Sequence, residues 1–342
     1  MNPAGPPRYK RSAAERREAR AAYGFLAPAM ALFVVFVAIP VVAALYLSFT
    51  RYDIFHAPLW VGLDNYRALE TDTVFRQSLA NTFYYAACTI VPGMSLSLLL
   101  AMILNAKLRG ITFYRAAYYL PVVTSLVAVA MIWMWLLQPA NGLVNQMLAN
   151  VWEPSVRAFG HLVQFITFGH AGQGWAHYLT QQPTWLGDPT GDKYLSFLSY
   201  PLSLAMRSIV MVALWSGLGW NMVIYLAGLQ GIPVHLYESA VLDGAGPWAR
   251  FRHITWPLLK PTTFFIFVTS VIGASQVFGT VYVMTNGGPN NTTTTIVHQI
   301  FQNAFAFLKM GYASAMAFVL FLIIFVISMI NWVFLKGDVE YS

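Results

Sequence analysis

Charge is scarce in this chain. Only 10% of its 342 residues are Asp, Glu, Lys or Arg, while 58% are hydrophobic. Soluble domains carry roughly 25% charged residues, because polar groups must cover a water-facing surface. A chain of this length with so little charge cannot cover such a surface, and the composition predicts an integral membrane protein. The net charge of +7 then fits basic residues kept on one side of a bilayer rather than nucleic-acid binding.

Cysteine and phosphate-binding motifs are nearly absent as well. The single cysteine, Cys88, excludes a disulfide within the chain, and its apolar setting favours a small packed residue. No glycine is followed by lysine, so the phosphate-binding loop of many ATP-binding proteins is excluded. His161, His170 and His177 are not spaced like zinc ligands. The sequence predicts neither a metal nor a cofactor.

Six long apolar runs dominate what is present. A helix that crosses the bilayer core needs about 20 apolar residues, and these runs are too long for the strands of a membrane barrel. The predicted fold class is therefore an all-α membrane protein with six transmembrane helices. The predicted spans are 24–48, with a bend near Pro40, 83–105, 118–137, 203–229, 262–284 and 313–335.

Basic residues set the predicted orientation. Most lysines and arginines lie in the arm 1–22, after the second and fourth spans, and in the tail 336–342. The positive-inside rule makes these segments cytoplasmic, including the loop 231–261 and both termini. The long loop 138–200 is then extracytoplasmic. The basic arm either lies against anionic headgroups or forms an unordered tail.

The predicted spans contain no Asp, Glu or Lys, and Arg207 stands near the edge of one. Carriers driven by protons or sodium usually hold ionisable groups inside the membrane, because those groups bind the coupling ion. The pattern therefore favours an energy source on a partner protein. A channel or secondary carrier that works alone is the alternative from a different class.

The most patterned polar segment is the loop 231–261. Pro233 suits the first turn of a helix, and Gly244 suits the position after its end, where a left-handed backbone is common. Pro247 is expected to start a second short helix and Pro257 to stop it. The small residues between the two helices allow close approach of another protein. Spacing alone fits an ordinary cytosolic loop at least as well.

This loop is similar to the coupling loop of permease subunits in ATP-driven importers. The importer motif reads Glu-Ala-Ala, three residues, Gly, nine residues, then Ile-x-Leu-Pro. Ser239 replaces an alanine of that pattern, and Trp256 replaces a leucine. The resemblance assigns ATPase coupling to Glu238, Ser239, Ala240, Asp243, Gly244, Ala245, Phe251, Ile254 and Pro257.

Further motifs extend the resemblance over about residues 24 to 335. They resemble those of carbohydrate permeases of the maltose and glycerol-phosphate type, in particular the first permease of the pair. The resemblance implies a type I importer permease fold, in which 151–183 is an insertion. The motifs include Trp60-Val61-Gly62-Leu63-Asp64-Asn65-Tyr66, Tyr119-Leu120-Pro121, Leu229-Gln230-Gly231-Ile232-Pro233 and Thr285-Asn286-Gly287-Gly288-Pro289.

The resemblance also implies a multi-pass subunit of a bacterial or archaeal plasma membrane that is not itself an enzyme. Its implied partners are a second homologous permease, two ATP-binding subunits that hydrolyse ATP, and an extracytoplasmic solute-binding protein. The implied cargo is a sugar or sugar derivative, moved by alternating access. A permease for another class of solute in the same architecture is the alternative.

In related maltose permeases the fourth and fifth spans hold the sugar. Here Ala274 and Val277 stand where asparagines of the family hydrogen-bond it, while Trp220 offers a ring for stacking. Each polar candidate also fits a role in helix packing within the bilayer. The expected substrate-pathway positions are Ser216, Gly217, Trp220, Asn221, Ser270, Ala274, Gln276 and Val277.

Overall fold

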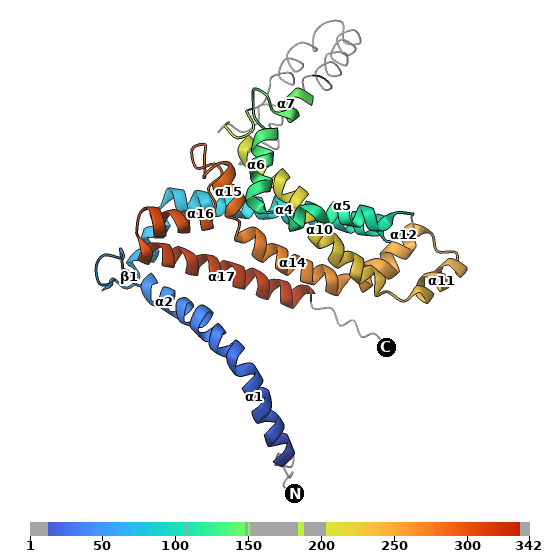
Figure 1. Cartoon of the computed structure of the whole chain (residues 1–342), viewed down its shortest axis with the longest axis horizontal. Coiled ribbons are helices and arrows are strands. Elements are labelled where there is room, and N and C mark those ends of the chain that lie inside the picture. Colours follow the sequence, from blue (N-terminus) through green and yellow to red (C-terminus); the bar gives the residue numbers. More distant parts are fainter. Residues whose placement is uncertain (1–12, 107–108, 148–149, 151–183, 188–202, 336–342) are drawn as a thin grey trace.

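The computed structural model describes residues 13–106, 109–147, 150, 184–187 and 203–335. The predicted insertion 151–183 with its three histidines and the tail 336–342 lie outside these residues. The described helices form an elongated bundle. The helix α1 (Ala13–Phe33) diverges from this bundle, and α6 (Leu126–Leu136) projects from it at an angle (Figure 1). The 231–261 loop lies at one end of the bundle. A small hairpin lies at the other end (Figure 1).

The first span follows one continuous helical path. It consists of α1 (Ala13–Phe33), the π-helical turn η1 (Val34–Ala38) and α2 (Ile39–Ser48). Pro40 lies in the first turn of α2, directly after the π turn. A π turn relieves the clash between a proline ring and the preceding carbonyl groups, so the helix passes Pro40 without ending. None of the most apolar window of this span is buried within the described chain.

A hairpin and two helices follow. β1 (Thr50–Arg51) pairs antiparallel with β2 (Leu59–Trp60), and α3 (Asp64–Thr71) leads to α4 (Thr73–Leu104). α4 begins at residue 73, whereas the predicted span begins at residue 83. Asp72 explains the early start, because its carboxylate accepts hydrogen bonds from the first free amides of the helix.

The third predicted span, 118–137, is two helices rather than one. α5 (Ile111–Val123) and α6 (Leu126–Leu136) meet at 97°. Thr124 is extended between them, and its hydroxyl donates to the carbonyl of Pro121 at 2.7 Å. Only Thr124 and Ser125 interrupt the apolar run in sequence, and the bend therefore arises from backbone conformation that composition does not record.

The remaining elements include the last three spans. α14 (Lys260–Ser275) and α15 (Gly279–Met284) together are one candidate span, interrupted at residues 276–278. The short helix α7 (Leu143–Met147) precedes this group in the chain. The group comprises α10 (Leu204–Gln230), α11 (Val234–Leu242), α12 (Pro247–Arg250), η3 (Phe251–Thr255), α13 (Trp256–Leu258), α14 (Lys260–Ser275), α15 (Gly279–Met284), α16 (Ile296–Phe301), η4 (Gln302–Ala306) and α17 (Met310–Leu335).

The number of spans agrees with the predicted fold class. Among the described residues, five helices are long and apolar enough to cross a membrane, and the bent pair α5–α6 makes six if it counts as one span. The chain is thus an all-α membrane protein.

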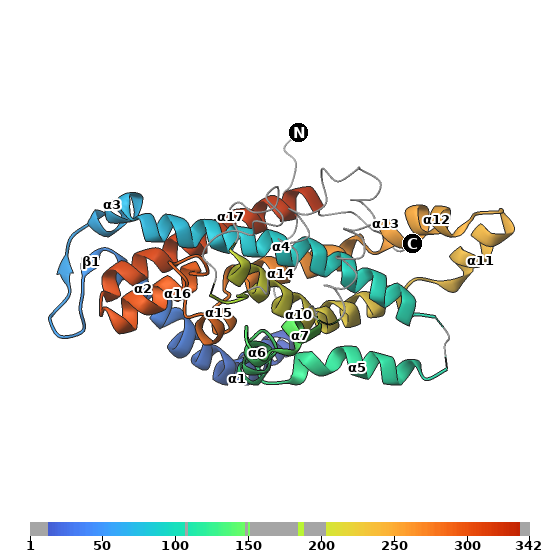
Figure 2. The same ribbon diagram turned by 90° about the horizontal axis from the view of Figure 1, so that it is seen from above.

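Packing is centred on α10, which contacts α4, α5 and α14 (Figure 2). Gly219 permits the close approach of α5, because a Cβ at this position would collide with the carbonyl oxygen of Tyr118. At the end of the bundle that carries α11, a buried cluster includes Leu229, Ile232 and Leu259. This cluster supports the 231–261 loop.

Candidate functional site

The 231–261 loop forms a sharp corner between α11 and α12. Gly244 follows the end of α11 with φ at +78°, in the left-handed region. The amide of Ala245 donates to the carbonyl of Ala240 at 2.8 Å, and the amide of Gly244 donates to that of Val241 at 3.0 Å. These two bonds form the Schellman motif of helix ends. The predicted helix end at Gly244 is confirmed.

Pro257 does not end the second helix, contrary to the expectation from sequence. The helical path runs from Pro247 through α12, the π turn η3 and α13, and a turn at Leu259 leads into α14. The π turn lies directly before Trp256 and Pro257. Such a turn accommodates the proline ring, as at Pro40. The second arm of the corner is therefore joined to the fifth span by helical backbone.

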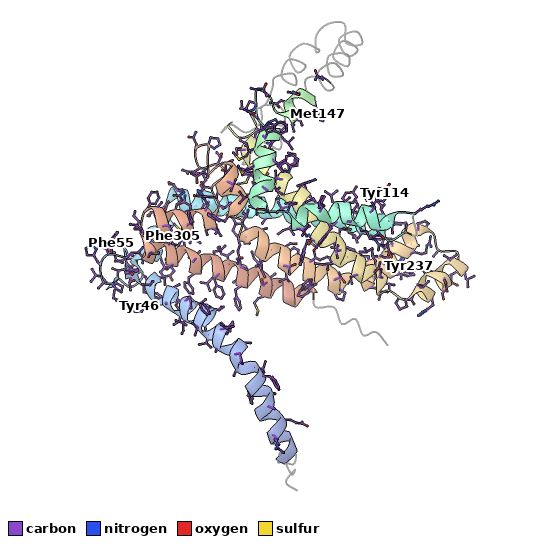
Figure 3. All side chains as sticks on the ribbon, in the orientation of Figure 1. Tyr46, Phe55, Tyr114, Met147, Tyr237 and Phe305 are labelled. Carbon is purple, nitrogen blue, oxygen red and sulfur yellow. The ribbon has the colours of Figure 1, made fainter. Side chains whose placement is uncertain are left out.

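The two arms of the corner are held together and fixed to the bundle. The hydroxyl groups of Tyr237 in α11 and Thr255 in η3 form a hydrogen bond of 2.9 Å. Phe251 and Ile254 pack against the buried cluster around Leu259. Figure 3 labels Tyr237 at this end of the bundle, opposite Phe55 and Phe305. Two of the predicted coupling residues, Phe251 and Ile254, thus face the bundle.

The tip of the corner is exposed and apolar. Leu242 is 88% exposed and Trp248 is 70% exposed. Glu238 and Asp243 are exposed beside them and form no salt bridge with any described residue. Ser239 and Gly244 are also exposed, whereas Ala240, Ala245 and Pro257 are half-buried. A water-facing loop rarely concentrates large apolar side chains in this way unless a partner covers them.

Of the hollows around the described part of α10, two contain predicted pathway residues. The first hollow has a volume of about 360 Å³ and is bordered by α5, α6, α10 and α15. Four predicted pathway residues line it, namely Ser216, Gly217, Trp220 and Asn221. Sequence reasoning missed Thr124 and Thr280 in its wall. Both are single threonines in apolar surroundings, and no spacing marks them as special.

The second hollow lies between α4, α10 and α14 and has a volume of about 190 Å³. Its wall includes the predicted residues Ser270 and Ala274, and it shares Gly217 and Asn221 with the first hollow. Thr89 and Tyr85 of α4 also line it and were not predicted. Asn221 is therefore the polar side chain common to both hollows.

The other two predicted pathway residues line neither hollow. Gln276 and Val277 lie in the break between α14 and α15, where Gln276 is exposed and Val277 packs against a buried cluster. The carbonyl of Val277 accepts a hydrogen bond from the hydroxyl of Thr295 at 2.9 Å. These two positions thus belong to the interrupted part of the fifth span.

Residues 285–295, here called the distal loop, connect this break to α4. The side-chain amide of Asn81 donates to the carbonyls of Asn291 at 3.0 Å and Thr294 at 2.9 Å. The hydroxyl of Thr82 accepts from the amide of Ile296 at 3.0 Å. The distal loop is fixed to α4 by its backbone, and Thr295 extends that connection to the fifth span.

Known proteins share this architecture. The permease UgpA of the sn-glycerol-3-phosphate transport system of Brucella abortus is 30% identical over 322 residues, which cover 94% of this chain and 96% of that protein. The permease AraP of the arabinooligosaccharides transport system of Bacillus subtilis is 31% identical over 315 residues, covering 91% and 87%.

A solved structure is similar in fold. A chain of a bacterial ABC transporter involved in the import of the acidic polysaccharide alginate matches with a TM-score of 0.72 and 21% identity, covering 96% of this chain and 99% of that chain. The profile of one protein family matches residues 82–335, which is most of the sequence. This chain therefore belongs to the family described as the binding-protein-dependent transport system inner membrane component.

Proposed function

We propose that this chain is the membrane-spanning permease of an ATP-driven importer for a sugar, and that the corner around Gly244 receives the work of ATP hydrolysis. The observation that carries the proposal is the exposed apolar tip, Leu242 and Trp248, on an arm joined by helical backbone to the fifth span. The named cargoes of relatives, among them arabinooligosaccharides, support a sugar.

Coupling in this proposal is mechanical. Two ATP-binding subunits supply the energy, and one of them covers Leu242 and Trp248, with Glu238 and Asp243 available for pairing at the rim. The Tyr237–Thr255 bond keeps the two arms at a fixed angle, so a displacement of the tip moves the start of α14. A partner shifts a conformational equilibrium only through contacts that differ between the states. The tip is the surface that offers such contacts.

The route of the cargo follows the two hollows. The first hollow adjoins the 97° bend between α5 and α6, and the second adjoins α14 just before its break. Backbone that leaves the helix inside a membrane is tolerated where it is buried or lines a water-filled space. We assign the two interruptions to the gate that opens and closes this route during alternating access.

The divergent first span supports a second permease as partner. The first span exposes Phe25, Phe36 and Val42 along its length, and its α2 segment packs against α17 (Figure 1). In this proposal a homologous permease covers this surface in place of lipid. The family's description also implies a solute-binding protein that delivers the cargo. In this arrangement α11, α12 and both termini face the cytoplasm.

Orientation and partners are tested together. In a Cys88→Ser background, which removes the single native cysteine, Leu242→Cys is expected to react with a charged thiol reagent only from the cytoplasmic side. Phe55→Cys, in the hairpin at the other end, is expected to react only from outside. The chain purified from its native membrane is expected to retain a second permease and an ATP-hydrolysing subunit. Labelling of Leu242→Cys from outside would overturn the topology.

A further inference from the structure

We propose that the route through this chain is built for an uncharged sugar that donates hydrogen bonds, rather than for a carboxylate or phosphate. The proposal rests on the proposed function and narrows its cargo. It starts from the hydroxyl groups in the walls of the two hollows and from what their protons already bind. The relatives' named cargoes include both charged and uncharged solutes, so they leave this choice open.

Three wall hydroxyls use their protons within the chain. Thr89 donates to the carbonyl of Tyr85 at 2.7 Å, Thr124 to that of Pro121 at 2.7 Å, and Ser216 to that of Ala213 at 3.2 Å. A hydroxyl has one proton to donate and two lone pairs that accept. With its proton engaged, each of these oxygens presents only acceptor capacity to the hollow.

Acceptor oxygens select donors. Three further hydroxyls of these walls, on Tyr85, Ser270 and Thr280, make no hydrogen bond with any described residue and can both donate and accept. The hydroxyls of a neutral sugar donate as well as accept, so they match such a wall. An ionised carboxylate accepts only, and its oxygens would face the lone pairs of Thr89, Thr124 and Ser216. Burying a charge without a partner costs much more than burying a paired hydroxyl. No described residue that lines either hollow carries a compensating positive charge, so the walls disfavour a buried anion.

The remaining wall groups complete a surface for a sugar. Trp220 is 52% exposed and lines the first hollow, where its ring is available to the apolar face of a pyranose. Asn221 lines both hollows, and its side chain makes no hydrogen bond with any described residue. Its amide can donate a hydrogen bond to a sugar hydroxyl and can also accept one from it.

The basic group on α10 lies away from these walls. Arg207 precedes Ser216 by nine residues, about 13 Å along the helix axis, and it already interacts within the chain. It lines neither hollow. The described residues that line the two hollows are all uncharged. This half of the route thus offers the cargo an aromatic face, the amide of Asn221, acceptor oxygens and hydroxyls that can also donate, with no cation among its described residues.

The first test identifies the cargo. The solute-binding protein that co-purifies with the transporter is titrated calorimetrically with neutral oligosaccharides, matched uronic-acid oligosaccharides and sugar phosphates. Binding of a neutral sugar is expected. Binding of an acidic sugar or a sugar phosphate would overturn this inference and leave the proposed function standing. Binding of a solute that is not a sugar would overturn both.

The second test asks whether the walls themselves act. The complete transporter is placed in liposomes, and uptake of the identified sugar is measured. Trp220→Leu is expected to raise the KM about five-fold, with partial recovery in Trp220→Tyr. Ala274→Lys, which places a cation at the second hollow, is expected to lower uptake about ten-fold. A rise in uptake for Ala274→Lys would indicate an anionic cargo and overturn the inference.

The control variant is Phe321→Leu, on an exposed face of α17 away from the hollows. It is expected to match the wild type in uptake and in the yield of monodisperse protein, which checks membrane insertion for all variants. If Trp220→Leu lowered uptake only in proportion to the amount of folded transporter, with an unchanged KM, Trp220 would have no role in holding the sugar and the inference would fail.

Discussion

The hydroxyl of Thr295 donates to the carbonyl of Val277 at 2.9 Å, and this bond joins the distal loop to the break in the fifth span. The break frees carbonyls that a continuous helix would satisfy, and Thr295 supplies a donor for one of them. Because Asn81 fixes the same loop to α4, the break is positioned by a residue more than 190 positions away in the sequence. The interrupted geometry is thus set within the chain.

Thr295→Val is expected to impair transport while preserving insertion. Valine keeps the branched shape of threonine but removes the donor, leaving a buried carbonyl unsatisfied at a cost of about 1–3 kcal/mol. We expect uptake in liposomes to fall about ten-fold. Thr295→Ser retains the hydroxyl and is expected to keep most of the activity. Equal uptake by Thr295→Val and Thr295→Ser would show that the bond has no part in positioning the break.

Gly244→Val is expected to uncouple ATP hydrolysis from uptake. Nothing lies within 4 Å of a Cβ at this position, so space is available, but φ is +78°. A left-handed backbone costs an ordinary residue roughly 1–2 kcal/mol, and a β-branched one is less tolerant still. Asparagine adopts this conformation more readily, so Gly244→Asn is the matched control. The measurement is uptake per ATP hydrolysed in liposomes.

The ratio is expected to fall at least ten-fold for Gly244→Val and by less than half for Gly244→Asn, with both proteins inserted at wild-type levels. If Gly244→Asn failed as badly as Gly244→Val, bulk at the corner and not its backbone conformation would be decisive.

Much of the fold was predictable because a bilayer imposes a length on apolar helices, and the runs in this chain meet it. The end of α11 was predictable for a similar reason, since Gly244 fits a left-handed position. The bend at Thr124 and the passage of the helix through Pro257 were not. Both depend on backbone geometry, an extended residue in one case and a π turn in the other, that residue types do not specify.

The candidate route was predictable in part. Positions counted along α10 lie in the walls of the hollows, because helical spacing brings Ser216, Gly217 and Trp220 to neighbouring turns. Thr89 of α4 could not be recognised, since a lone threonine in an apolar span has no distinguishing pattern. Val277 was assigned by the same counting, which assumes an unbroken helix and therefore loses the register at the break. Gln276 was chosen as a polar residue near the counted positions.

Asp72 is expected to make stability depend on pH at the start of α4. Burial acts to raise the pKa of Asp72, but hydrogen bonds from Tyr312, at 2.6 Å, and from the amides of Phe75 and Val74 outweigh it, so its pKa lies below the usual 3.8. The folded state therefore binds this proton less readily than the unfolded state. Its stabilisation is present above pH 3.8 and is lost as the pH falls through the lower folded pKa.

The measurement is thermal unfolding of the purified chain in detergent between pH 6 and pH 3. Tyr312→Phe removes one bond to the carboxylate, worth about 1.5 kcal/mol, and is expected to lower the melting temperature at pH 6 more than at pH 3. Asp72→Asn retains a capping side chain and is expected to flatten the pH dependence. An unchanged pH profile in Asp72→Asn would assign the acid sensitivity to other groups.

Leu242→Glu is expected to release the ATP-binding subunits from the membrane complex. The side chain of Leu242 is 88% exposed in this chain, and covering it with a partner contributes about 1.5–3 kcal/mol, or roughly a 10- to 150-fold change in affinity. A carboxylate in its place both removes that contribution and introduces a charge that contact would desolvate.

The measurement is the amount of ATP-binding subunit that co-purifies with the affinity-tagged chain. Leu242→Met, similar in volume and apolar, is the matched control and is expected to retain the subunits. Wild-type retention by Leu242→Glu would place the contact elsewhere on the chain, because a buried carboxylate without a partner is too costly to leave such an interface intact.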